Sequence, residues 1–318
     1  MFKLRGSLIS LVAATALVFP APAIATSTTC QTAFSSAQIS PSVAPTNLTP
    51  LSGTKIPSEG VWKSTKIKVN GHVALKTTRV RFDKIHGSSY ATLIWIDSKL
   101  LAFKQIPGLT VPKKGLGTGK VSKSMRACYM AAFTGGYLMT DSGGGAKYGS
   151  TTVAPMKKKM GTLVTYTDGS MDVVKWPNID ATKRVAELRQ NLKLIVENGI
   201  SKVPAGEPHN SWGWVWHGTG INNNDVRRTG VGIRSDGTIV WVMGAELNAT
   251  NLAKVLIRGG AIRAMALDMN KGFANGYLYG PYHTKKTVGG IIDPNMTIWP
   301  SRFWNAAQRD FIAVFSRS

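Results

Sequence analysis

An aspartate that directly follows an apolar run is the first candidate for chemistry in this sequence. The run Ala266-Leu267-Asp268-Met269-Asn270 places a carboxylate immediately after residues typical of a buried strand. Sheets commonly present catalytic groups where a strand ends, although an aspartate at such a place also starts many turns. Asp268 is therefore a candidate catalytic carboxylate, with a turn-forming role as the alternative.

Two further stretches combine polar groups with backbone freedom. Arg227 and Arg228 enter a strand-like run, and an arginine that faces a pocket can hold phosphate through its fork of donors. Thr134, Gly135 and Gly136 end another apolar run, where paired glycines let the backbone bend or approach a ligand closely. The alternatives are surface charge for the arginines and a tight turn for the glycines.

A third group consists of tryptophans at strand spacing. Trp212, Trp214 and Trp216 alternate along the chain, so a strand would place their rings on one face and His217 on the other. Such a row could stack sugar rings, and Trp214, Trp216 and His217 are counted as candidate substrate-binding residues. Large aromatic residues are often buried, so a place in the core is the alternative.

Several common catalytic signatures are absent. The sequence has no Walker loop, no GxSxG, no HExxH and no pair of cysteines at zinc spacing, which excludes the enzyme classes that carry those motifs. Its 5 histidines are scattered, so a site built from histidines alone is not indicated. No cofactor and no protein metal site are expected, and a role for a divalent metal is left open.

Five short motifs carry a resemblance to a known family. They are FTGGY at 133–137, GGG at 143–145, RQNL at 189–192, RTGVG at 228–232 and LDMN at 267–270. In this order they resemble the phosphodiester glycosidase family, whose best-known member removes N-acetylglucosamine from a phosphodiester. The secreted actinobacterial branch is the most similar, from about Val61 to Arg317. Thr134 stands where the family usually has asparagine, and no glycine run follows Asp268.

The resemblance implies hydrolysis of a sugar-1-phosphodiester at the sugar carbon. The phosphate leaves as an anion, so one carboxylate and an arginine could suffice without a strong proton donor. It assigns Asp268 as base or nucleophile, Arg228 to the phosphate and Asn270 to the same catalytic set. Thr134, the amides of Gly135 and Gly136, and Arg227 are assigned to substrate binding. The other carboxylates near the motifs in sequence are Asp141, Asp225 and Glu246.

The elements that must position these residues are mainly strands. Alternating apolar residues and Asp-Gly or Asn-Gly turns predict strands and hairpins; the ranges are 62–69, 72–82, 90–96, 161–166, 171–176, 229–233, 238–243, 261–267, 276–279 and 311–315. Apolar spacing predicts helices over 181–197 and 249–258. The predicted fold class is α+β, a mostly antiparallel mixed sheet with two main helices packed on it.

The N-terminal region predicts export. Residues 1–25 have a basic start, an apolar run and a small-residue cleavage site, as secretory signal peptides do. Residues 26–60 form a Ser-, Thr- and Pro-rich arm, and 61–318 form the phosphodiester glycosidase-like domain. Cys30 and Cys128 are the two cysteines, and in an oxidising compartment they are expected to form a disulfide.

The charge of the chain indicates its partner. The sequence carries 39 Lys and Arg against 16 Asp and Glu, a net charge of +23, so an anionic partner is expected. Export and charge together predict a phosphate-containing glycan or wall polymer, outside the cell and at its wall. No nucleic-acid-binding motif is recognisable, and no stable membrane insertion is expected after signal cleavage. The alternative function is a non-catalytic module on the same fold that binds anionic wall polymers.

Overall fold

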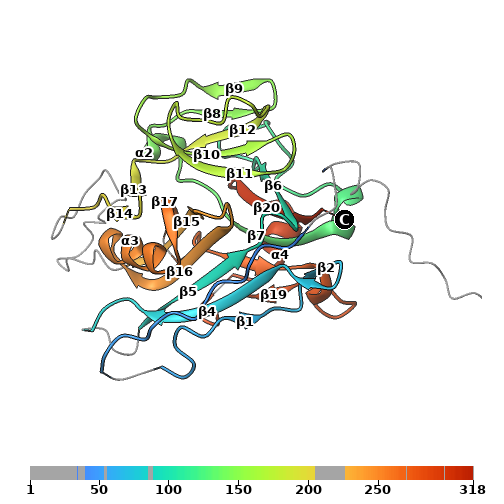
Figure 1. The fold of residues 1–318 in the computed structure, drawn as a ribbon. Helices are drawn as coiled ribbons and strands as arrows, with labels where there is room; N and C mark the ends of the chain where they lie inside the picture. The colour runs from blue at the N-terminus through green and yellow to red at the C-terminus, as the bar shows by residue number, and fades with distance from the viewer. Residues whose placement is uncertain are drawn as a thin grey trace, which may run out of the picture.

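In the computed structural model, β-strands dominate the chain. The structure describes residue 34 and residues 40–53, 56–84, 89–204, 226–269, 271–296 and 298–317. Within these ranges the strands form four sheets, and every paired strand is antiparallel to its neighbour. Figure 1 shows the sheets packed together, with the helical segments beside and between them.

The largest sheet, called here the central sheet, has eight strands among the described residues. Their order is β1 (Lys63–Ser64), β4 (Leu75–Arg81), β5 (Tyr90–Ile96), β16 (Ile239–Leu247), β15 (Val226–Arg234), β17 (Ala261–Met269), β13 (Leu194–Glu197) and β14 (Ile200–Ser201). Side chains alternate between its two faces. On β16, Trp241 belongs to the core shared with the other sheets, whereas Val240 and Val242 pack toward α3 (Ala249–Arg258).

Two five-stranded sheets and a hairpin complete the described strands. The β7 sheet has the order β19 (Gly290–Ile291), β18 (Gly276–Leu278), β7 (Tyr129–Thr134), β20 (Phe311–Ser316) and β6 (Leu101–Ile106). The β10 sheet has the order β11 (Met171–Lys175), β10 (Gly161–Tyr166), β12 (Val185–Gln190), β8 (Ala146–Tyr148) and β9 (Thr151–Ala154). The hairpin pairs β2 (Lys68–Val69) with β3 (His72–Val73).

The predicted α+β class with two main helices is wrong. The helix predicted over 249–258 is present as α3, and its N-cap Asn248 accepts a hydrogen bond from the Asn251 amide at 2.8 Å. The helix predicted over 181–197 is instead β12 and β13. Between them Leu192 has a φ of 44°, which breaks any helix there. The remaining described helical segments are short: α2 (Met139–Ser142), α4 (Ser301–Trp304), η1 (Lys123–Cys128) and η2 (Gly280–Tyr282).

Pairing with neighbouring strands explains why residues 185–197 are not helical. β12 lies between β10 and β8, and β13 lies between β17 and β14. Glu187, Arg189 and Gln190 are all buried there with specific partners. Tertiary contacts of this kind override local helix preference, so the apolar spacing that indicated a helix was misread.

The described part of the N-terminal arm lies against the domain. The amide and the hydroxyl of Ser42 both donate to the Asp97 carboxylate at 2.8 Å. Glu59 forms a buried ion pair with Arg81, at 2.8 Å between Oε2 and Nε. These contacts fasten the segment that precedes β1 to the edge of the central sheet.

Candidate functional site

The central sheet and the β7 sheet meet at the end of β17, where Asp268 lies. β15 begins at the edge where β17 ends, and Arg228 is paired with Met269 across them. β7 likewise ends opposite the start of β20. The Asp268 amide donates to the Gly135 carbonyl at 2.9 Å and so joins the two edges directly. The stretches around 134–136, 227–228 and 266–269, far apart in sequence, are therefore neighbours in the structure.

Asp268 has the surroundings of an acid–base group. Its side chain is buried, Arg309 Nη1 donates to Oδ2, and the Met269 amide donates to Oδ1 at 2.9 Å. Burial raises the pKa of Asp268 from 3.8 to about 7, against the opposing effects of Arg309 and the Met269 amide. Loss of hydration outweighs the ion pair here. A carboxyl group with this pKa can take or give a proton at neutral pH.

Arg309 is held from a second side by an aromatic ring. Its guanidinium carbon lies 3.6 Å from the centroid of the Phe273 ring, and that of Arg302 lies 5.6 Å from the same centroid. Arg302 Nη1 also donates to the carbonyl of Gly272. Burial lowers the pKa of Arg302, which also responds to the charges of Asp268 and Arg309. Two arginines, Arg302 and Arg309, therefore lie near the Phe273 ring and close to the Asp268 carboxylate.

Arg228 lies on β15 beside the end of β17, where it is paired with Met269. It is buried, its Nε donates to the Leu247 carbonyl at 2.8 Å, and its Nη1 lies 3.7 Å from Met269 Sδ. Tyr137 is close by: burial raises the pKa of its hydroxyl to about 12, and the charges of both Arg228 and Asp268 act on it. Arg228 and Asp268, two of the predicted catalytic residues, are thus brought together around Tyr137.

A buried ion pair supports the loop that follows β7. Arg189 Nε donates to Asp310 Oδ2 at 3.0 Å, and Arg189 Nη2 donates to the carbonyl of Tyr137. Tyr148 Oη lies 3.4 Å from the same Asp310 oxygen. Asn191 accepts from the Tyr137 amide at 3.1 Å. Both the amide and the carbonyl of Tyr137 are therefore fixed by buried side chains.

The paired glycines lie against this ion pair. The Gly135 amide donates to the Asp310 carbonyl at 3.2 Å, and the Gly136 amide donates to Asp310 Oδ2 at 3.5 Å. A Cβ atom at Gly135 would lie 2.7 Å from the Asp310 carbonyl oxygen, and one at Gly136 would lie 2.9 Å from the Arg189 guanidinium. Both amides predicted to orient substrate are engaged with Asp310, and glycine is required for close packing.

Thr134 and Arg227, both predicted to bind substrate, hold loops around the site. The Thr134 hydroxyl donates to the carbonyl of Phe273 and accepts from the Asn275 amide at 3.1 Å. Arg227 donates to the carbonyls of Lys271 and Asn295. In this structure Thr134 therefore positions Phe273, the ring that carries the two arginines.

Several predicted residues lie outside the described residues. Asn270, Trp214, Trp216, His217 and Cys30 are among them, as is Asp225. Cys128 is described and buried, but its predicted disulfide partner is not. The other candidate carboxylates differ from Asp268 in exposure, because Asp141 and Glu246 are both exposed.

Sequence reasoning missed Arg302, Arg309, Phe273 and Tyr137 as site residues. None has a local signal, since each comes close to Asp268 or to its arginine partners only through the tertiary fold. The one usable hint was the Arg309-Asp310 pair next to the last strand. Its two charges face different partners, Asp268 and Arg189.

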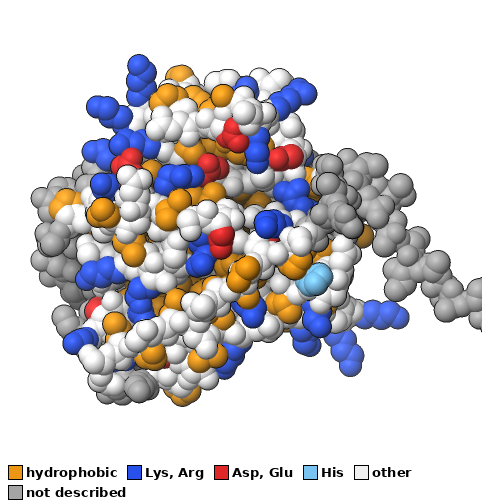
Figure 2. Space-filling view, viewed as in Figure 1, with side chains coloured by type: hydrophobic (Ala, Val, Ile, Leu, Met, Phe, Trp, Pro, Cys, Tyr) orange, Lys and Arg blue, Asp and Glu red, His pale blue; other side chains and the backbone are white. Residues whose placement is uncertain are grey.

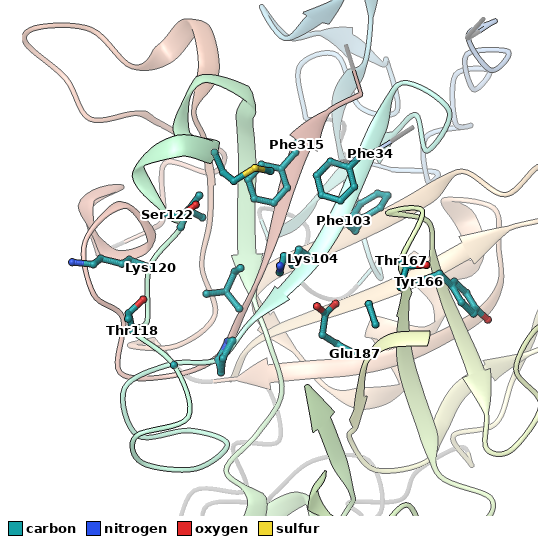
Figure 3. A pocket seen from close by; sticks show the side chains of 16 residues that line it. Phe34, Phe103, Lys104, Thr118, Lys120, Ser122, Tyr166, Thr167, Glu187 and Phe315 are labelled. Atoms are coloured by element: carbon teal, nitrogen blue, oxygen red, sulfur yellow. The ribbon is translucent and has the colours of Figure 1, made fainter. Parts of the chain in front are cut away.

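A hollow elsewhere in the molecule shares none of its lining residues with this site. It has a volume of about 570 Å³, and Phe103, Phe315 and Phe34 line one part of it. Figure 3 shows the Glu187 carboxylate and Lys104 among the labelled side chains. Burial raises the pKa of Glu187, and the Thr165 hydroxyl donates to it. Its lining brings one buried carboxylate and no arginine, so it lacks the combination found at Asp268.

Within the described ranges, no three His, Cys, Asp or Glu side chains are placed to hold a metal ion together. None of the helices in those ranges has both the length and the apolar character needed to cross a membrane.

Comparisons with known proteins give similarity at the level of solved structures. No protein-family profile matches the sequence, and no curated protein matches it. The catalytic domain of zebrafish N-acetylglucosamine-1-phosphodiester alpha-N-acetylglucosaminidase, auto-inhibited by its pro-peptide, is similar with a TM-score of 0.47 at 14% identity, over 81% of this chain and 88% of that chain. A hypothetical protein from Synechocystis gives a TM-score of 0.47 at 13% identity, over 81% and 64%. An exported protein from Burkholderia pseudomallei gives 0.38 at 14%, over 71% and 74%. Membership of the phosphodiester glycosidase family stays a prediction.

Proposed function

We propose that this protein is a secreted hydrolase that cleaves the C1–O bond of a sugar-1-phosphodiester, with an N-acetylglucosamine-like sugar, in a wall or extracellular glycopolymer. The observation that carries the proposal is the position of Asp268, a buried carboxyl with a pKa of about 7 that is surrounded by arginines. A phosphodiester needs this pair of features, positive charge for the phosphate and a carboxylate for the sugar carbon. The motif resemblance to phosphodiester glycosidases supports the same reaction.

In the proposed reaction, the C1–O bond breaks and the bonding electrons leave with the phosphate oxygen. Water supplies the new C1–O bond and gives one proton to Asp268 when that residue acts as base; as nucleophile, Asp268 would first bond to C1 and water would then release the sugar. The products are the free sugar and a phosphate monoester. Because the leaving group is an anion stabilised by arginine, no strong proton donor is needed.

A non-catalytic binding module is the second candidate, and one observation favours it. Both oxygens of the Asp268 carboxylate already accept hydrogen bonds, from Arg309 and from the Met269 amide. A carboxylate held in this way can serve as a fixed charge that keeps the arginines in place for an anionic polymer. Turnover is therefore the measurement that separates the two candidates.

The test is phosphorus NMR of an N-acetylglucosamine-1-phosphodiester, and of extracted wall polymer, incubated with the purified protein. Conversion of diester to monoester is expected for the wild type and not for Asp268→Asn. Asp97→Asn is the matched control, because Asp97 is equally buried but accepts its hydrogen bonds from Ser42, elsewhere in the molecule. Turnover that survives Asp268→Asn removes Asp268 from the reaction. Polymer binding without any turnover by the wild type favours the binding module.

A further inference from the structure

Arg302 and Arg309, the two arginines close to the Phe273 ring, carry more positive charge than the carboxylate beside them neutralises. Arg309 shares the Asp268 carboxylate, whereas Arg302 makes no ion pair with any described residue. Asp310, the other buried carboxylate close to them, is paired with Arg189. Two guanidinium groups close to one ring repel each other, and the Asp268 carboxylate, whose charge acts on both, can neutralise only one of them. A further negative group would balance the second.

The geometry favours a phosphate as that group. Each guanidinium has several N–H donors in one plane. One terminal nitrogen of Arg302 donates to the Gly272 carbonyl, and one terminal nitrogen of Arg309 donates to the Asp268 carboxylate. Among the described residues their remaining donors have no partner. Arg309 lies directly against the Phe273 ring, and Arg302 is held by its hydrogen bond to the Gly272 carbonyl, so both side chains lose little entropy when they bind a ligand. Forked donors of this kind match the oxygens of a phosphate.

An exposed tryptophan lies in the same turn as Arg302. Trp299 has 77% of its surface exposed, and the Arg302 amide donates to its carbonyl at 3.1 Å. Two buried tyrosines hold the backbone on either side of it. Tyr277 Oη donates to the Ile298 carbonyl at 2.7 Å, and Tyr279 Oη donates to the Pro300 carbonyl at 2.5 Å. The exposed indole of Trp299, on a backbone that is fixed on both sides, can therefore stack against a flat ligand surface.

We infer that Arg302 and Arg309, held on Phe273, bind the phosphate group of a phosphodiester-linked sugar, and that Trp299 stacks against the saccharide on the far side of that phosphate. The inference rests on the proposed function for the identity of the substrate and deepens it by assigning its phosphate and its second saccharide. It gives Thr134 a positioning role, because the Thr134 hydroxyl fixes the carbonyl of Phe273.

Binding of defined probes tests the phosphate assignment without relying on turnover. N-acetylglucosamine 1-phosphate is titrated into the wild type and into Arg302→Met by calorimetry. Loss of a charge-assisted forked contact should weaken binding about tenfold to a hundredfold. Arg126→Met is the matched control, since Arg126 is also half-buried on an aromatic ring, 4.6 Å from the Trp304 centroid. Arg302→Lys should bind with intermediate affinity, and it carries the same test if Arg302→Met does not fold.

The second arm tests Trp299 with a diester whose second alcohol is a hexose. Trp299→Ala should weaken binding of that diester about tenfold while binding of N-acetylglucosamine 1-phosphate is unchanged, and Trp299→Phe should restore it. Equal binding by Arg302→Met and Arg126→Met overturns the phosphate assignment. Equal binding of the diester by Trp299→Ala and the wild type overturns the stacking assignment. If both arms succeed but no diester is hydrolysed, the proposed reaction fails and the binding site stands.

Discussion

At the scale of single residues, the chemistry depends on the balance between burial and pairing at Asp268. Arg309 and the Met269 amide stabilise the ionised carboxylate, but burial opposes them and leaves its pKa at about 7. An exposed ion pair of the same geometry would keep an aspartate ionised at any neutral pH. Burying this carboxyl group lowers the stability of the fold at neutral pH, and it gives a group that can exchange protons near pH 7.

This balance makes protein stability depend on pH. The folded-state pKa of Asp268 lies above the value of 3.8 that it has when unfolded, so its contribution to stability is complete below about pH 4 and is lost as the pH rises to 7. Asp268→Asn carries no titrating group there. The stability of the wild type relative to this variant should therefore fall between pH 4 and pH 7, by up to about 4 kcal/mol.

Urea unfolding of both proteins at several pH values in this range checks the prediction. Comparing the two proteins at each pH cancels the titration of all other groups. A constant stability difference would show that the ion pair with Arg309 offsets burial, and a difference that grows in favour of the wild type as the pH rises would show that the ion pair outweighs it. Asp268 would then stay ionised at neutral pH, where it could act as a nucleophile but would be a weak base.

At the scale of elements, the site depends on how the β7 loop packs on the Arg189 and Asp310 pair. Arg189 cannot give way easily, because Asp310, the Tyr137 carbonyl and the Gln190 carbonyl all hold its guanidinium. The added methyl group in Gly136→Ala would lie 2.9 Å from that guanidinium. Overpacking of this kind should destabilise the protein by about 1–3 kcal/mol.

Gly272→Ala is the control for this substitution. Gly272 also lies in a loop beside the site, but no heavy atom lies within 4 Å of the position its Cβ would take. Thermal unfolding should therefore show a clear loss for Gly136→Ala and little change for Gly272→Ala. Equal effects of the two substitutions would mean that the Arg189 and Asp310 pair is not the rigid support inferred here.

The elements also show what could be read from the sequence and what could not. The strands β10 and β11 were predicted from alternating apolar residues and an Asp-Gly turn, and α3 from its apolar spacing, because these signals are local. β12 and β13 were predicted as one helix, since only the neighbouring strands make their polar residues buried partners.

The candidate site divides in the same way. Asp268 and Arg228 were predicted as site residues because each follows a local rule, a carboxylate after a strand and an arginine entering one. In the structure their strands are paired and both charges act on Tyr137, while their catalytic roles stay predictions. Arg302 and Phe273 could not be found, since no nearby residue indicates that one ring will carry two arginines. Gly136 was predicted to approach a substrate closely, and in the structure the group that it approaches closely is Arg189 of the protein itself.

At the scale of the whole molecule, the net positive charge determines the distance over which an anionic partner is attracted. The net charge is +23, and Figure 2 shows Lys and Arg side chains spread widely over one face with few acidic ones between them. Such a surface attracts a polyanion along its length, whereas the arginines around Asp268 act on one phosphate at a time. The two effects should respond differently to salt.

Raising the salt concentration from about 0.1 M to about 1 M shortens the screening length from about 10 Å to about 3 Å. Exposed charges lose most of their attraction over that range, while half-buried groups such as Arg302 and Arg309 lose less. Affinity for extracted wall polymer should therefore fall at least about tenfold, and affinity for N-acetylglucosamine 1-phosphate should fall by a smaller factor. Calorimetry at both salt concentrations measures the two ratios with the same protein. Equal ratios would mean that the polymer is held by the arginines at Asp268 alone. The wide basic surface would then contribute to solubility and not to recognition of the polymer.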